Sequence, residues 1–186
     1  MVNLKTYYEQ SKPLSQYIDD MTSNQAGIKE IDQRFVTPQN EPQLEKIKQK
    51  NYKYVLVISE DWCGDAMMNI PVLKHIAEQC DLEVRVFYRD EDTNLIDQYL
   101  TNGKSRSIPI FVFLNDQFEQ KAVWGPRAKE VQNFVDDIRS KHLPDKKDPL
   151  FDDKQKEVHQ MIRNRYLTDS QFWLYVYHSI LNRLTS

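Results

Sequence analysis

The spacing of apolar residues predicts that the chain begins with helices. Apolar side chains recur every three or four residues through the first fifty positions, which is the period of an amphipathic helix; they include Leu4, Tyr8, Leu14, Tyr17, Ile18, Ile28, Ile31 and Phe35. Pro13 separates the first two predicted helices, and the proline-containing segment 37–42 ends the third. We therefore predict a helical extension over residues 1–43, followed by a short helix that carries Leu44 and Ile47.

The period changes in the middle of the chain. Residues 54–58 form a continuous apolar run, which is typical of a strand buried on both faces. Further strands are predicted at 82–88, 109–114 and 118–124, with helices at about 65–79, 93–100 and after Gly125-Pro126. The order is β-α-β-α-β-β-α, so helical crossovers join parallel strands and the Asn115-Asp116 turn closes an antiparallel hairpin. An α/β domain with a mixed sheet is predicted over residues 44–141.

The C-terminal part returns to helical spacing. Residues 142–150 are polar and contain two prolines, which indicates a linker, and residues 151–186 form a second helical extension. Its last helix has one apolar stripe, made of Phe172, Trp173, Val176, Tyr177, Ile180 and Leu184. We expect this stripe to pack on the same domain; the alternative is a homodimer or partner surface.

Composition and charge exclude several classes of function. The 186 residues contain 25 Lys and Arg against 28 Asp and Glu, which argues against a nucleic-acid-binding surface. No apolar run is long enough to span a membrane, and the first residues lack the pattern of a signal peptide. With two cysteines, no disulfide framework is expected, and the predicted compartment is the reducing cytoplasm. The histidines lack metal-ligand spacing with cysteine, so neither a metal nor another cofactor is predicted.

The most informative position is Cys63, at the turn where the buried strand becomes a helix. A cysteine there lies over free backbone N–H groups and the positive end of the helix dipole, and both favour the thiolate. The thiolate is the reactive form of cysteine. Gly64 allows a sharp turn, and we expect the sulfur to be exposed and approachable.

The sequence around this cysteine resembles that of thioredoxins. Trp62-Cys63-Gly64-Asp65-Ala66 is similar to their WCGPC motif, and Pro71 stands where they keep a helix proline. Ile108-Pro109 is similar to their cis-proline and its preceding residue, and Gly125 to a glycine of the substrate groove. The likeness covers about half of the chain, and the whole resembles a bacterial thioredoxin-like family with WCGD-type, single-cysteine motifs.

The resemblance implies a thioredoxin fold and a set of site residues. Cys63 would be the catalytic nucleophile. The substrate groove would be formed by Trp62, Gly64, Asp65, Ile108, Pro109 and Gly125. A cis bond before Pro109 would leave the Ile108 backbone free to pair with an extended substrate segment, as in strand addition.

The departures from the family pattern decide the chemistry. Ala66 replaces the second, resolving cysteine, and Val57 stands where thioredoxins place a buried acid. Cys80 lies 17 residues after Cys63, which is roughly 25 Å along a helix and beyond the reach of a disulfide. We therefore expect Cys80 to be a packing residue and any mixed disulfide on Cys63 to be resolved by an external thiol.

Charged neighbours of Cys63 act in both directions. Glu60, Asp61 and Asp65 oppose thiolate formation, although Asp65 is also suited to cap the helix N–H groups. Arg106 and Arg127 are placed to approach from the groove side and offset these acids. The sequence leaves the net direction open.

Three functions follow from these residues. The first is a monothiol oxidoreductase that acts through Cys63 on protein disulfides or mixed disulfides, with a low-molecular-weight thiol as its second partner. The alternative is a redox-inactive binding module that keeps the groove of the thioredoxin fold. A minor third possibility is an iron–sulfur cluster bridging two chains, as in monothiol glutaredoxins, whose CGFS motif differs from the Cys63-Gly64-Asp65-Ala66 found here.

Overall fold

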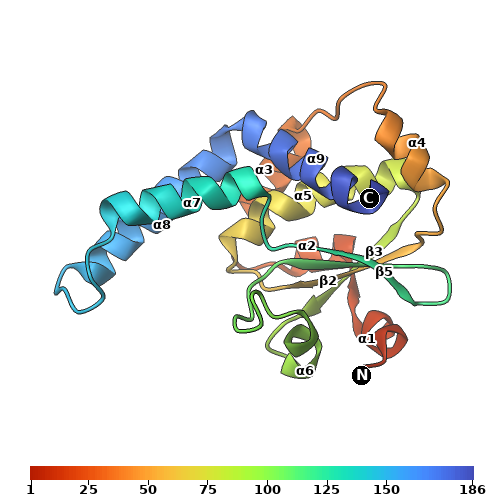
Figure 1. The fold of residues 1–186 in the computed structure, drawn as a ribbon, viewed down its shortest axis with the longest axis horizontal. Coiled ribbons are helices and arrows are strands. Elements are labelled where there is room, and N and C mark those ends of the chain that lie inside the picture. Colours follow the sequence, from red (N-terminus) through yellow and green to blue (C-terminus); the bar gives the residue numbers. More distant parts are fainter.

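The computed structural model describes residues 1–186 and shows a mixed five-stranded sheet flanked by helices (Figure 1). This is the predicted α/β architecture with helical extensions at both ends. In chain order the elements are α1 (Leu4–Gln10), β1 (Lys12–Pro13), α2 (Leu14–Asp20), α3 (Gln25–Arg34), α4 (Pro42–Lys48), β2 (Tyr54–Ser59), α5 (Gly64–Cys80), β3 (Glu83–Tyr88), α6 (Thr93–Ile96), the 3₁₀ turn η1 (Asp97–Tyr99), β4 (Ile110–Leu114), β5 (Gln120–Trp124), α7 (Lys129–His142), α8 (Phe151–Thr168) and α9 (Ser170–Thr185).

The sheet has the strand order β1-β3-β2-β4-β5. β2 and β3 are parallel, as the intervening helix α5 requires, and β4 pairs antiparallel with both β2 and β5. Val57 of β2 is aligned with Val86 of β3 on one side and with Phe111 of β4 on the other. The two central strands are almost completely buried, which explains why their sequences are continuously apolar instead of alternating.

Helices cover both faces of this sheet (Figure 1). α3, α5 and α9 lie on one face, whereas α1 and α6 lie on the other. α7 and α8 form an antiparallel pair that projects beyond the edge of the sheet. None of the helices combines the length and apolarity that a membrane-crossing helix requires.

The apolar stripe of α9 belongs to the central core of the chain. All six residues of the stripe are buried, and α9 contacts α4, α5 and β5. The Trp124 indole donates a hydrogen bond to Ser179 Oγ (2.9 Å), and Trp173 donates one to the Tyr166 carbonyl (2.7 Å). The stripe is therefore occupied within the chain, and a homodimer would have to use another face of the helix.

The N-terminal segment differs from its prediction in one respect. Lys12 and Pro13 do not merely separate two helices, because they form a two-residue edge strand that pairs antiparallel with Val86 and Arg85. Proline fits an edge position, since the N–H that it lacks would point away from the sheet. The first fifty residues are thus not wholly helical. A two-residue strand is too short to produce a visible alternation of apolar and polar residues.

Two cis peptide bonds lie where β4 begins and β5 ends. Ile108-Pro109 is cis, as the resemblance implies, and Gly125-Pro126 is also cis, which the sequence analysis did not anticipate. Gly125 has φ 129°, and a Cβ at this position would lie only 2.3 Å from the Pro109 carbonyl oxygen. Glycine is therefore required here both by the backbone conformation and by the approach of the Pro109 segment.

We predict that Gly125→Ala lowers the free energy of unfolding by at least about 2 kcal/mol, because both the φ angle and the contact with Pro109 become unfavourable. Urea denaturation followed by circular dichroism measures the change. Gly103→Ala is the matched control, since Gly103 also has a positive φ (68°) but open space around it. Equal losses in the two variants would contradict the role given to the Pro109 contact.

Candidate functional site

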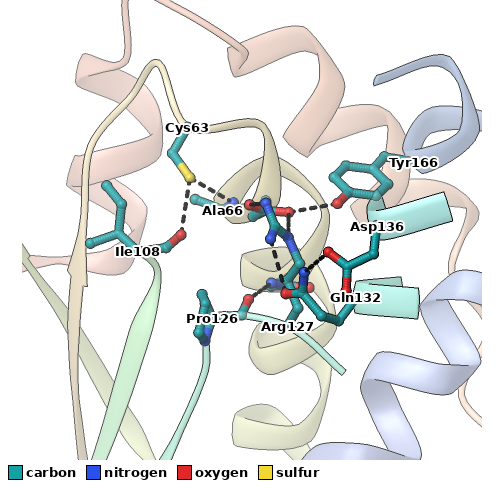
Figure 2. A network of polar contacts seen from close by, with 10 residues as sticks. Cys63, Ala66, Ile108, Pro126, Arg127, Gln132, Asp136 and Tyr166 are labelled. Atoms are coloured by element: carbon teal, nitrogen blue, oxygen red, sulfur yellow. Dashed lines mark hydrogen bonds and ion pairs between the residues drawn. The ribbon is translucent and has the colours of Figure 1, made fainter. Parts of the chain in front are cut away.

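Cys63 occupies the N-cap position of α5, at the end of the loop that leaves β2. Its sulfur accepts a hydrogen bond from the Ala66 N–H (3.4 Å) and its thiol donates one to the Ile108 carbonyl (3.4 Å) (Figure 2). The first contact favours the thiolate, because it satisfies a free N–H of the helix with the sulfur. The second contact favours the protonated thiol, because the thiol donates its hydrogen to the Ile108 carbonyl. Cys63 is thus joined to both the helix and the residue before cis-Pro109.

The Cys63 sulfur is less exposed than the sequence suggested. Only 7% of the residue is accessible, which corrects the expectation of an exposed thiol. Burial, followed by repulsion from the Asp65 carboxylate, raises the pKa of Cys63 to about 12. Hydrogen bonds from backbone N–H groups and the charge of Arg127 act in the opposite direction but are weaker. The helix terminus alone therefore does not activate this cysteine in the free protein.

The strongest polar cluster of the site is built around Asp65, in the first turn of α5. The Arg127 guanidinium donates two hydrogen bonds to its carboxylate, from Nε (2.9 Å) and Nη2 (2.8 Å). The Tyr166 hydroxyl donates a third to Asp65 Oδ1 (2.6 Å) (Figure 2). The Asp65 and Arg127 side chains are only 14% and 17% exposed, so this bidentate pair is largely removed from solvent. It connects α5, the segment after β5, and α8.

Burial and charge act together on the partners of Asp65. Burial by itself disfavours the charged guanidinium, but attraction to Asp65 and the hydrogen bonds with it raise the pKa of Arg127. The pKa of Tyr166 is raised, first by burial and then by the Asp65 charge. Arg127 and Tyr166 therefore keep their protons, and both remain hydrogen-bond donors to the carboxylate.

All three acids of the turn are engaged by hydrogen bonds, and Asp65 does not take the capping role that the sequence suggested. The Asp65 side chain binds Arg127 and Tyr166 instead of capping the helix, a role that the Cys63 sulfur takes. The Glu60 carboxylate accepts from the Asp90 backbone N–H (2.9 Å), and the Asp61 carboxylate from that of Thr22 (3.0 Å). Both carboxylates are thereby used to fix neighbouring loops.

Two cavities open on Cys63 and share Trp62, Asp65 and Arg127 as walls. The first, of about 440 Å³, extends toward the start of β4 and is also lined by Arg89, Ser105, Arg106, Ser107, Ile108 and Pro126. The second, of about 580 Å³, extends toward the C-terminal extension and is also lined by Ser23, Asn24, Gly64, Arg139, His159, Ile162, Arg163 and Tyr166. Cys63 therefore contributes to both cavities despite its small exposed surface.

Trp62 and Arg106 stand at the rim of the site. Trp62 is 56% exposed, which excludes plain core packing, and the Arg89 guanidinium lies 5.0 Å from its ring centroid. Arg106 lines the first cavity, but its guanidinium is paired with Asp97 (2.7 Å) on the other side of the loop. Of the two arginines that the sequence placed near the sulfur, only Arg127 contacts one of its acidic neighbours.

The replaced positions of the motif are apolar. Ala66 and Val57 are both buried, so neither a second thiol nor an acid lies beneath Cys63. Cys80 is the last residue of α5 and is a free, buried cysteine whose pKa burial raises to about 11. No group of three His, Cys, Asp or Glu side chains is arranged to hold a metal ion.

The sequence analysis missed the contribution of the extensions to this site. Asn24 comes from the N-terminal extension, and His159, Arg163 and Tyr166 come from α8 of the C-terminal extension, whereas Arg139 comes from α7 of the central domain. Tyr166 is 101 residues from Asp65, and no local motif marks either side chain as part of a pair. The one available signal was Arg127, a basic residue close after Gly125.

Comparison with known proteins supports the resemblance to thioredoxins. The sequence profile of a family described as thioredoxin matches residues 11–139. The crystal structure of an HIV epitope-scaffold is similar to this chain, with a TM-score of 0.67, 13% identity and 98% of both chains covered. The structure of a protein of unknown function from Pseudomonas aeruginosa has a TM-score of 0.64 and 14% identity, with 98% of this chain and 99% of that chain covered. No curated protein sequence matches the chain.

We predict opposite effects of the two charges near Cys63. Asp65→Asn removes the repulsion of the thiolate and lowers the pKa of Cys63, whereas Arg127→Gln removes an attraction and raises it further. At a fixed pH of about 9, the rate of alkylation by iodoacetamide changes about tenfold for each pKa unit, so Asp65→Asn should react faster and Arg127→Gln slower than the unmodified protein.

Mass spectrometry of the Cys63 peptide separates this reaction from that of Cys80, and circular dichroism verifies that each variant is folded. Asp61→Asn is the matched control, because its carboxylate lies in the same turn but binds the Thr22 N–H. Changes of the same sign in both test variants would show that altered exposure of the sulfur, and not charge, controls its reactivity.

Proposed function

Because the chain belongs to the thioredoxin family, we propose that it is a thiol–disulfide oxidoreductase that works with a single cysteine, Cys63. The observation that supports this most directly is the position of the sulfur. It caps α5, lies 3.4 Å from the carbonyl that precedes cis-Pro109, and borders two cavities. One thiol is therefore adjacent both to a main-chain pairing site and to space for a second reactant.

The proposed reaction begins when a protein segment that carries a disulfide pairs with the backbone of Ile108. A main-chain N–H of that segment takes the Ile108 carbonyl as its acceptor, and the Cys63 thiol loses this hydrogen bond. The thiol then transfers its proton to solvent, and the thiolate attacks the nearer sulfur of the disulfide. A bond forms between Cys63 Sγ and the substrate sulfur, the substrate S–S bond breaks, and the leaving sulfur departs with the electron pair as a thiolate.

Burial of Cys63 has a consequence for this cycle. Because burial raises the pKa of Cys63 to about 12, only a very small fraction of the free thiol is ionised at neutral pH, so unbound protein reacts slowly with random disulfides. Release of the mixed disulfide falls to an external small thiol, because Ala66 offers no second sulfur. The cycle therefore needs a supply of reduced small thiols, which a reducing compartment such as the cytoplasm provides.

The second candidate is a redox-inactive binding module, and the same burial of Cys63 favours it. A protonated, desolvated thiol can serve simply as an N-cap, while Trp62 and the Ile108 edge bind an extended segment without chemistry. This candidate uses the same cavities as the first. The two differ in whether the sulfur changes its covalent state.

Turnover distinguishes the two candidates. The substrate is a protein whose single cysteine forms a mixed disulfide with a small thiol, and the same small thiol is supplied in excess as the reductant. We expect the turnover rate of Cys63→Ser, after subtraction of the uncatalysed background, to be at least about 100-fold lower than that of the unmodified protein, because no thiol nucleophile remains. Cys80→Ser, the matched control, should retain full activity since Cys80 lies at the far end of α5.

Equal, background-level turnover by the unmodified protein and Cys63→Ser would contradict the oxidoreductase proposal. Retention of the same protein partners by both forms under reducing conditions would then establish the binding module.

A further inference from the structure

The second cavity at Cys63 has a charge that the rest of the chain does not share. The whole protein has a net charge of −3. In this cavity, three arginines, Arg127, Arg139 and Arg163, stand against one carboxylate, that of Asp65, with His159 beside them. The lining therefore has an excess of two positive charges even with a neutral histidine.

Much of this charge is free of protein partners. Arg127 is fully engaged by Asp65 and Gln132. Arg163 uses only one nitrogen, which donates to Asn24 Oδ1 and to the Met67 sulfur, and it pairs with no carboxylate. The side chains of Arg139 and His159 make no hydrogen bond or ion pair within the chain. Guanidinium groups with free donors that line one cavity are suited to bind carboxylates.

The cavity is also placed correctly for a second reactant. Ile108 and Tyr166 lie on either side of the turn that carries Cys63 (Figure 2), so the cavity bordered by Tyr166 is separate from the edge that pairs with a protein segment. Its volume of about 580 Å³ lies in the range of small-molecule sites. Residues of α7 and α8 form one of its walls, and its volume fits a small molecule better than a long peptide.

We propose that this cavity binds the resolving thiol of the proposed reaction, and that this thiol is a low-molecular-weight compound with two or more carboxylates. Arg139 and Arg163 bind the carboxylates, and the thiol of the compound lies against Cys63. This inference rests on the proposed function for its chemistry, but the binding of the anionic compound can be measured without it.

The resolving step balances with two molecules of the compound. The thiolate of the first attacks Cys63 Sγ from the cavity, the bond between Sγ and the protein substrate breaks, and the substrate leaves as a thiolate that takes a proton from water. The thiolate of the second molecule attacks the sulfur of the first, which releases Cys63 as a thiolate that is protonated again. The two small thiols are oxidised to their disulfide, and the substrate disulfide is reduced.

Binding is tested with S-methylglutathione, a dicarboxylate whose thioether cannot exchange, on the full-length protein and on Cys63→Ser. Nuclear magnetic resonance titration should show shifts at Gly64 and on α8. The diethyl ester of the same compound, which lacks both carboxylates, should bind at least about tenfold more weakly, as should the acid at high salt.

Arg139→Gln and Arg163→Gln should each weaken binding of S-methylglutathione about five- to tenfold. The exposed Arg139 side chain makes no hydrogen bond or ion pair, so its variant is expected to fold normally. Lys156→Gln is the matched control for Arg163→Gln, because Lys156 is an exposed positive charge on the same helix, α8, but lies outside the cavity. Equal binding of acid and ester, unchanged affinity in both arginine variants, or binding only of a longer acidic peptide would overturn the proposal.

The test separates the two proposals. If S-methylglutathione binds as expected but Cys63 supports no turnover, the cavity is an anion site and the oxidoreductase proposal fails. If turnover depends on Cys63 but does not respond to Arg139→Gln or Arg163→Gln, the oxidoreductase proposal stands and the cavity proposal fails.

Discussion

The buried ion pair between Asp65 and Arg127, with Tyr166 as a third partner, is the interaction on which the arrangement of the site depends. It joins three segments that are far apart in the sequence: the first turn of α5, the segment after cis-Pro126, and the extension helix α8. Removing one partner of such a pair leaves an uncompensated charge away from water, which costs about 3–5 kcal/mol, so the three segments hold one another in place. The same carboxylate that fixes the geometry also disfavours the Cys63 thiolate. Asp65 thus positions Cys63 by fixing the surrounding segments, and at the same time it keeps the Cys63 thiol protonated.

The N-terminus of α5 does not lower the pKa of Cys63 in this protein. A free N–H group and the helix dipole favour the thiolate, and in an exposed cysteine they would lower its pKa. Here desolvation is the larger effect, because only a small part of Cys63 reaches solvent. A thiolate of high pKa is a strong nucleophile but a poor leaving group. Disulfides formed with Cys63 are therefore expected to be long-lived compared with those of activated cysteines.

The sequence predicted the central fold well, because its signals are local and repeated. The apolar runs of β2 and β4, the helical spacing of α5 and the order of the crossovers lead directly to a mixed sheet. Cys63, Ile108 and Pro109 came together as the family resemblance implied.

The burial of the sulfur could not be predicted, since it depends on segments that pack around the turn from elsewhere in the chain. The same holds for the contact of Asp65 with Tyr166, which joins residues 101 positions apart. β1 was missed because two residues show no period. The capping role predicted for Asp65 was wrong because its carboxylate binds Arg127 and Tyr166 while the Cys63 sulfur caps the helix.

Of the three tryptophans, Trp62 alone is exposed, whereas Trp124 and Trp173 are buried among α9 and the sheet. Indole emission depends on contact with water, so the fluorescence of Trp62 differs in wavelength from that of the other two. Because Trp62 borders both cavities and lies next to Cys63, the protein carries an intrinsic optical reporter of whatever enters them. Occupancy of the site can thus be followed in real time with no label attached.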